Sequence, residues 1–226
     1  MRLLLTNDDG WDAPGLAALA DVARRFGEVT IVAPRDPHSY AGHRVTTDQP
    51  LHLTPTGDRC YHLSGTPADC VRLAIRGLGI NPDWVLAGIN RGGNLGADIH
   101  ISGTVAAARE AALLGVASIA VSQYVRRDLS LDWAHAAELA HAAIAQLLNG
   151  ALPPKEFWNV NLPHLPPNTG AETVHCDPDN EPLDVRFRCD EGSWRYSGTY
   201  AARPRTPGRD VDHCFGGAIT VSRLIL

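Results

Sequence analysis

The first ten residues, MRLLLTNDDG (1–10), place a short apolar run directly before two adjacent aspartates. Residues 2–6 have the length and the leucine content of a buried β-strand, and Gly10 permits a sharp turn after it. Neighbouring side chains on a strand point to opposite faces, so Asp8 and Asp9 can reach one ligand only if the chain turns here. A buried strand that is followed by two adjacent aspartates predicts a sheet with a functional site at the end of that strand.

Strand-like and helix-like segments alternate over the first two thirds of the chain. Pro14 opens a helix whose apolar residues recur at helical spacing until Gly27. Asp132 caps a long alanine-rich helix that ends near Asn149 and Gly150. Between these two helices the sequence predicts strands at 29–33, 61–63, 84–87 and 117–121 and helices at 66–75 and 104–114. This alternation predicts an α/β fold, a Rossmann-like three-layer sandwich with a mainly parallel sheet.

The character of the sequence changes near residue 163. Residues 1–162 are predicted to form the Rossmann-like α/β catalytic core. The stretch 163–226 is rich in Pro, Arg and Asp and shows no further helical period. We expect it to form β-hairpins and an extended arm, which complete the domain and engage another subunit.

The composition excludes several classes of protein. The chain is 44% hydrophobic and 20% charged, as in a globular protein. Its net charge of -5 argues against a stable nucleic-acid partner. No apolar run approaches the roughly 20 residues that span a bilayer, so no membrane partner is expected. The five cysteines are odd in number and form no CxxC pair, which predicts free thiols in a reducing cytoplasm rather than a zinc site.

Three polar clusters follow predicted strands, at residues 7–10, 34–42 and 88–96. In open α/β sheets, ligands collect at the carboxyl ends of the strands. The carboxylates of Asp8 and Asp9 supply hard anionic oxygens, which suit Mg²⁺ or Mn²⁺ better than Zn²⁺. The alternative is an Asp-Gly turn in which both acids are solvated. We take the two aspartates as candidate metal ligands and catalytic residues.

The glycine-rich cluster AGINRGGNLG (87–96) leads to a Ser-Gly-Thr turn at 102–104, where a helix is predicted to begin. Its glycines allow a ligand to approach the backbone, and Asn90 and Asn94 offer neutral oxygens and amide donors. Free N–H groups and the helix dipole make the 102–104 turn a candidate phosphate cradle. The alternative is an ordinary helix N-cap. The cluster lacks the GxGxxG register and the lysine of a P-loop. Because no GxGxxG follows the first strand, a dinucleotide-dependent oxidoreductase is disfavoured.

Several segments resemble the SurE family of survival-protein nucleotidases, in the family's order and over most of the chain. They are TNDDG (6–10), AGINRGGNLG (87–96), Asp98, SGTVAAAREAALLG (102–115), ASIAVS (117–122), FWNVNLP (157–163) and RPRTPGRDVDHCFGGAITVS (203–222).

This resemblance implies a metal-dependent phosphatase that acts on nucleoside 5′- and 3′-monophosphates and, in some members, on short polyphosphate. It implies one divalent ion, Mg²⁺ or Mn²⁺, with the ligands Asp8, Asp9, Ser39 and Asn90. It implies phosphate contacts from Asn94, Ser102, Gly103 and Thr104. It also implies a homodimer or homotetramer held partly by an exchanged C-terminal arm.

The chain departs from the family's pattern at three positions. Tyr40 stands where the family usually has glycine after the ligand serine, Ile101 where it commonly has tyrosine, and Arg209 where the tail usually has threonine. The first departure supports an alternative function, a non-catalytic module that binds or senses nucleotides without turnover. His38 and His43 of the same loop are candidates for protonating the leaving oxygen, although loop histidines are more often solvated.

Overall fold

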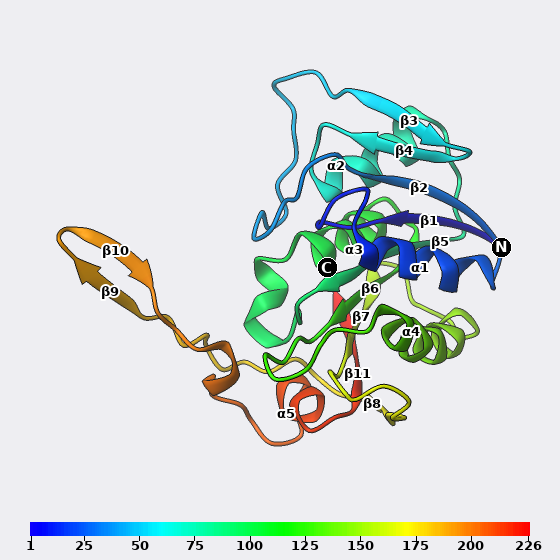
Figure 1. Cartoon of the computed structure of the whole chain (residues 1–226). Coiled ribbons are helices and arrows are strands. Elements are labelled where there is room, and N and C mark those ends of the chain that lie inside the picture. Colours follow the sequence, from blue (N-terminus) through cyan, green and yellow to red (C-terminus); the bar gives the residue numbers. More distant parts are fainter.

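The leucine-rich strand β1 (Arg2–Thr6) lies inside a nine-stranded sheet in the computed structural model, which describes residues 1–226 (Figure 1). The strand order is β3-β4-β2-β1-β5-β6-β7-β11-β8. Parallel pairing runs through β4 (Cys60–Leu63), β2 (Glu28–Pro34), β1, β5 (Trp84–Arg91), β6 (Ala117–Gln123) and β7 (Glu156–Leu162). The predicted mainly parallel sheet is confirmed.

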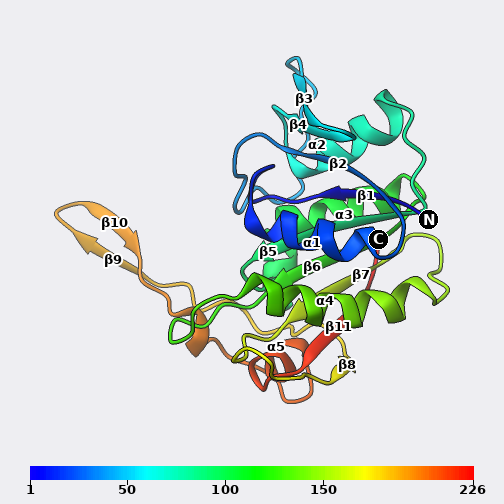
Figure 2. The ribbon, with the colours of Figure 1, turned by 45° about the vertical axis from the view of Figure 1, so that its right-hand side comes forward.

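Both faces of this sheet are covered by helices (Figure 2). Leu3 and Leu5 pack with residues of α1 (Pro14–Arg24) and α4 (Trp133–Leu148), whereas Leu4 packs with residues of α2 (Pro67–Arg72) and α3 (Gly103–Leu113). The alternation along β1 explains why its sequence is continuously apolar, since a parallel strand is buried on both sides. The three-layer sandwich is confirmed, and α2 continues into the π-helical turn η1 (Leu73–Gly77).

The C-terminal stretch forms more than the expected hairpins and arm, because part of it belongs to the main sheet. β11 (Ile219–Ile225) pairs antiparallel with β7 and parallel with β8 (Thr173–His175), so the end of the chain is built into the main sheet. A short helix, α5 (Asp210–Phe215), precedes it. On the opposite edge, β3 (Leu53–Gly57) pairs antiparallel with β4. The helix was not expected because six residues are too few to show a helical period.

The predicted hairpin is present and projects away from the sandwich (Figures 1 and 2). It consists of β9 (Phe187–Asp190) and β10 (Ser193–Tyr196), which form a separate two-stranded sheet. The five cysteines are free thiols, as predicted. None of the helices has both the length and the apolar character that a membrane span requires.

Candidate active site

Asp8 follows the buried end of β1 and is only 6% exposed. Thr104 of α3 donates two hydrogen bonds to its carboxylate, one from the backbone N–H to Oδ2 (3.2 Å) and one from the hydroxyl to Oδ1. Burial raises the pKa of Asp8 from 3.8 to about 6; the bonds from Thr104 oppose this rise and the charge of Asp9 adds to it. No cationic side chain contributes. The fold thus holds a buried, uncompensated carboxyl group that a cation would stabilise.

Asp9 and Asn90 lie at the same edge of the sheet, because β1 and β5 are neighbours. Asp9 Oδ2 accepts the backbone N–H of Arg91 at 2.9 Å. The side-chain nitrogen of Asn90 donates to the carbonyl of Gly92 at 2.8 Å, which leaves the amide oxygen for another partner. Both carboxylates and Asn90 are therefore brought together at the ends of two adjacent strands.

The loop between β2 and β3 brings Ser39 to this edge. The backbone N–H of His38, the residue before it, donates to the carbonyl oxygen of Asp8 at 2.8 Å. Gly42, on the far side of the turn, donates its N–H to the carbonyl of Ile101 at 3.0 Å. Ser39 itself is exposed. Ser39 is therefore the next residue after His38, whose backbone is hydrogen-bonded to the main chain of Asp8.

These donors fit a hard divalent ion better than a soft one. No three His, Cys, Asp or Glu side chains lie close enough together to hold a metal ion. An ion at this edge would have to be bound by a pair of carboxylates and by neutral oxygens, a set that suits Mg²⁺ or Mn²⁺. The uncompensated carboxyl group of Asp8 is the structural feature that favours such a cation. Metal binding by Asp8, Asp9, Ser39 and Asn90 stays a prediction.

The first turn of α3 lies against the carboxylate of Asp8. Ser102 is the N-cap, and its hydroxyl oxygen accepts the N–H of Val105 at 3.0 Å. Thr104, whose N–H was expected to face a phosphate, instead gives it to Asp8. The N–H of Gly103 and the O–H of Ser102, whose oxygen only accepts here, are the donors of this turn that remain for an anion. Sequence reasoning missed the bond between Thr104 and Asp8, because the two residues are far apart in the chain.

Asn94 anchors the glycine-rich loop. Its backbone N–H donates to Asn161 Oδ1 at 2.7 Å, and its carbonyl accepts the side-chain amide of Asn159 at 2.8 Å. Its own amide nitrogen donates to Ser122 Oγ at 2.7 Å. Asn94 is therefore tied to β6 and β7, and its predicted phosphate contact stays a prediction. The two asparagines of β7 were missed, although polar residues two apart in the apolar segment FWNVNLP are a signal for them.

A second anchor of the glycine-rich loop comes from the C-terminal stretch. The loop ends in the 3-10 helix η2 (Gly96–His100), which contains the buried Asp98. Arg203, whose side chain is fully buried, places Nη1 2.7 Å from Asp98 Oδ2, and the Tyr200 hydroxyl donates to the same oxygen at 2.6 Å. Tyr200 begins the short 3-10 helix η3 (Tyr200–Ala202), just after the hairpin. The hairpin's own connection thus helps to hold the site.

The two loop histidines do not stand free. His38 is partly buried, and this burial lowers its pKa, so less of it carries a proton near neutral pH. His43 Nε2 lies 2.8 Å from Glu110 Oε2. Neither observation supports the predicted role of proton donor to the leaving oxygen.

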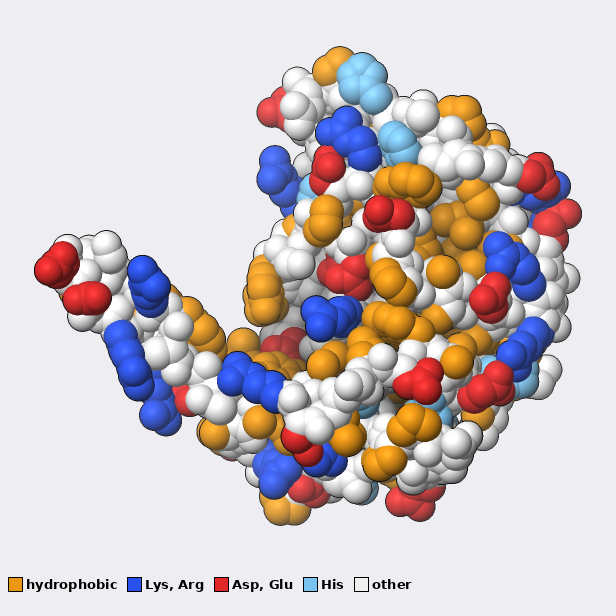
Figure 3. All heavy atoms as spheres, viewed as in Figure 1, with side chains coloured by type: hydrophobic (Ala, Val, Ile, Leu, Met, Phe, Trp, Pro, Cys, Tyr) orange, Lys and Arg blue, Asp and Glu red, His pale blue; other side chains and the backbone are white.

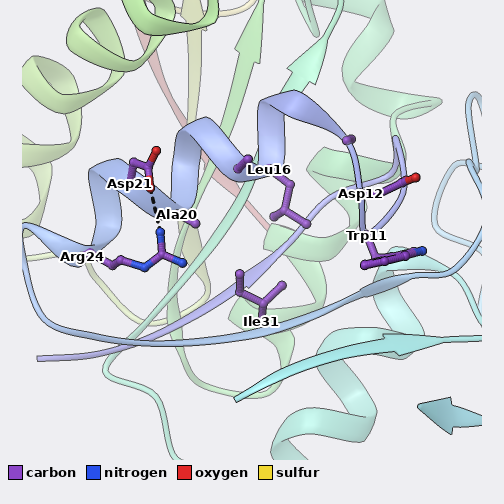
Figure 4. A pocket seen from close by; sticks show the side chains of 9 residues that line it. Trp11, Asp12, Leu16, Ala20, Asp21, Arg24 and Ile31 are labelled. Carbon is purple, nitrogen blue, oxygen red and sulfur yellow. Dashed lines mark hydrogen bonds and ion pairs between the residues drawn. The ribbon is translucent and has the colours of Figure 1, made fainter. Parts of the chain in front are cut away.

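A cavity of about 340 Å³ opens beside the carboxylate pair. It is lined by Asp9, Asp12, Ala13, Pro14, Gly15, Arg91 and Trp133. A second, smaller groove lies between α1 and β2 (Figure 4), where Leu16 and Ile31 line it near the ion pair of Asp21 and Arg24. That groove contains none of the predicted site residues, whereas the cavity beside Asp9 contains one of them.

The chain also matches the model of a known protein family. The family model described as "Survival protein SurE" matches residues 3–181. The chain belongs to the SurE family. The resemblance seen in the sequence motifs is therefore confirmed.

Individual relatives extend this finding over the whole chain. A protein of Nostoc sp., named only provisionally as a 5′-nucleotidase, is 48% identical over 225 residues, which are 99% of each chain. The 5′-nucleotidase SurE of Pelobacter propionicus is 45% identical over 167 residues, 74% of this chain and 67% of its own. The crystal structure of the SurE protein from Aquifex aeolicus matches with a TM-score of 0.86 at 32% identity, covering 100% of this chain and 93% of that one.

The buried Asp8 gives the metal-free protein a pH-dependent stability. Its carboxyl group binds a proton more tightly in the folded than in the unfolded chain, so the free energy of unfolding falls as the pH rises from about 4 to about 6. Above that range the loss is about 3 kcal/mol, at about 1.4 kcal/mol per pKa unit. We therefore expect Asp8→Asn to raise the free energy of unfolding near pH 8 and to change it little near pH 4. Urea denaturation with EDTA measures both values; an equal effect at the two pH values would contradict the assignment.

Proposed function

We propose that this chain is a divalent-metal-dependent 5′-nucleotidase, which hydrolyses nucleoside monophosphates to nucleoside and inorganic phosphate. The names of its SurE relatives support the reaction. The observation that carries the proposal is the buried Asp8 carboxyl group, which has no cationic partner and touches the first turn of α3. A candidate cation site and a candidate anion site would thereby share one wall, an arrangement suited to metal-assisted hydrolysis of a phosphate monoester.

The roles follow from the positions of the side chains. Asp8, Asp9, Ser39 and Asn90 would hold the ion. When bound, Mg²⁺ or Mn²⁺ would polarise the phosphoryl group and make an attacking water more acidic. The Gly103 N–H, the Ser102 hydroxyl and the dipole of α3 would bind the phosphoryl oxygens as charge develops on them. Asp9, the less buried carboxylate, would accept the proton of the water.

The cavity beside Asp9 gives the leaving nucleoside a place. Its volume of about 340 Å³ lies within the roughly 300–1,000 Å³ of small-molecule sites. Trp133 offers an aromatic surface there and Arg91 a positive charge. Nucleoside 3′-monophosphates and short polyphosphate are further substrates that we propose from the family resemblance.

A panel of nucleoside 5′- and 3′-monophosphates and polyphosphate, assayed with Mg²⁺ and Mn²⁺, tests this function. We expect phosphate release with a divalent ion and none after EDTA treatment. Release that is unaffected by EDTA would contradict the metal site. Thermal stabilisation by nucleotides without phosphate release under any metal would instead favour the non-catalytic nucleotide-binding module.

We also propose that the projecting hairpin joins two or more copies of the chain. Phe187, Trp194 and Tyr196 are 56%, 69% and 58% exposed and share one face of the hairpin, with Phe187 and Tyr196 directly opposite each other. The other face carries Arg188 and Arg195, and basic side chains line the arm in Figure 3. Because an isolated hairpin is at best marginally stable in water, the aromatic face needs a partner.

Replacing Trp194 by serine is expected to weaken self-association. Truncation of an aromatic hot-spot residue of an interface costs about 2 kcal/mol or more, which is a more than tenfold rise in the dissociation constant. Sedimentation velocity over a concentration series measures it. Arg195→Ser, on the opposite face of the same strand, is the matched control and should change the constant less. An unchanged monomer–oligomer balance in Trp194→Ser would remove this face from the interface.

A further inference from the structure

One side-chain contact fixes the Ser39 loop to helix α3. His43, four residues beyond Ser39, places Nε2 2.8 Å from Oε2 of Glu110. The Glu110 side chain is 8% exposed and that of His43 23%. Because water has little access to the pair, this hydrogen bond stabilises the loop more than a solvent-exposed bond of the same length would.

The turn at Ser39 requires support from outside. The N–H of Ala41 donates to the carbonyl of His38 at 3.2 Å and closes the turn, and Tyr40 at its third position has a φ of 59°. Type II turns take glycine at that position, and a residue with a Cβ pays about 1–2 kcal/mol for a left-handed conformation. The Tyr40 side chain is 83% exposed, so packing of its ring does not offset this cost.

The anchors of this turn all lie on segments that form the site. On one side His38 is bonded to the main chain of Asp8, and on the other Gly42 is bonded to Ile101, next to Ser102. Both are backbone contacts. The side-chain contact of His43 with Glu110 follows one residue beyond Gly42 and joins the loop to the helix that carries Thr104, the partner of Asp8.

We propose that His43 and Glu110 are positioning residues, which hold the strained Ser39 turn so that the Ser39 hydroxyl can serve as a ligand of the divalent ion. This inference rests on the proposed metal site. It replaces the role of proton donor for His43 with a role in holding a ligand. Arg72 of α2, whose Nε lies 3.8 Å from Oε1 of Glu110, binds the other oxygen of the same carboxylate.

Calorimetric titration of the full chain with Mn²⁺ alone tests this role. We expect His43→Ala and Glu110→Ala each to raise the dissociation constant about tenfold, as is common when the support of a metal ligand is removed. The double variant should lose no more than either single variant, because both substitutions remove the same contact. Glu110→Gln keeps an oxygen that can accept the bond from His43, so it should bind Mn²⁺ nearly as tightly as the unaltered chain.

Enzyme kinetics distinguish a loss of metal-ligand positioning from general damage to the active site. The Mn²⁺ concentration at half-maximal rate should rise by the same factor of about ten, whereas kcat at saturating Mn²⁺ should stay near that of the unaltered chain. Glu138→Ala is the control, since it breaks the surface ion pair between Glu138 of α4 and Arg25, the residue after α1, and neither residue lines the cavity beside Asp9. It should change neither quantity. His43 lies in a loop without secondary structure, so His43→Ala should fold even where Glu110→Ala does not.

Two kinds of result are distinguishable. An unchanged Mn²⁺ affinity in His43→Ala, additive losses in the double variant, or a Glu110→Gln protein as weak as Glu110→Ala would overturn the positioning role. A chain that binds no Mn²⁺ before any substitution would overturn the metal site itself, and with it the proposed function.

Discussion

Asp9→Asn is expected to lower kcat/KM for nucleoside monophosphates by roughly 100-fold or more, because it removes one of the two anionic ligands of a hard divalent ion. The substitution keeps the shape of the side chain. Its amide oxygen can still accept the N–H of Arg91, the bond that Asp9 makes at 2.9 Å. The fold should therefore survive, and the loss should appear equally in Mn²⁺ affinity and in phosphate release.

Asp12→Asn is the matched control for this prediction. Asp12 is exposed, lines the same cavity as Asp9, and carries the same charge three residues along the chain. Because Asp12 is not a predicted metal ligand, its loss should leave the Mn²⁺ affinity unchanged and lower kcat/KM much less than Asp9→Asn does. Full activity in Asp9→Asn would sink the metal assignment, and equal losses in both variants would point to the charge of the cavity rather than to a ligand.

The sequence was sufficient to predict the helices and strands that are marked by a local pattern of residues. β1, α1 and α4 were predicted close to their observed bounds, because apolar periodicity and capping residues mark such elements. Parallel pairing places the ends of neighbouring strands at one edge, so the proximity of Asp8, Asp9 and Asn90 also followed. β11 did not follow, since it pairs antiparallel with β7 and only a six-residue helix precedes it, so the alternation of strands and longer helices that marked the parallel strands is missing there.

In the site, too, some residues could be predicted from local patterns and others could not. The polar residues that end β1 and β5 could be found from the sequence, whereas the residues that support them could not. Thr104 reaches Asp8 across 96 positions, and Glu110 reaches His43 across 67. Asn94 illustrates this gap: its position in a glycine-rich loop suggested a phosphate contact, but nothing in the sequence indicated that its backbone and its amide nitrogen are bound to β6 and β7. Which residue touches a ligand and which holds the loop depends on contacts between distant segments.

Gly103→Ala is expected to abolish most activity without unfolding the protein. A Cβ at this position would lie 2.9 Å from the Cβ of Asp8 and 3.0 Å from its Oδ2, closer than atoms of these kinds pack. Asp8 would have to move, and its two hydrogen bonds from Thr104 would be lost. A ligand displaced by about 1 Å can cost roughly 100-fold in rate. Mn²⁺ affinity and kcat/KM should therefore fall together.

The effect of Gly103→Ala on stability distinguishes damage to the site from damage to helix α3. Gly103 begins α3, and alanine in a helix is favoured over glycine by about 1 kcal/mol, so helix propensity opposes the steric cost. A thermal midpoint near that of the unaltered chain, combined with a large loss of Mn²⁺ binding, would locate the damage at Asp8. Gly170→Ala is the control, because nothing lies within 4 Å of the added Cβ. Normal Mn²⁺ binding in Gly103→Ala would show that Asp8 can shift freely, and that its position against α3 is not what the site requires.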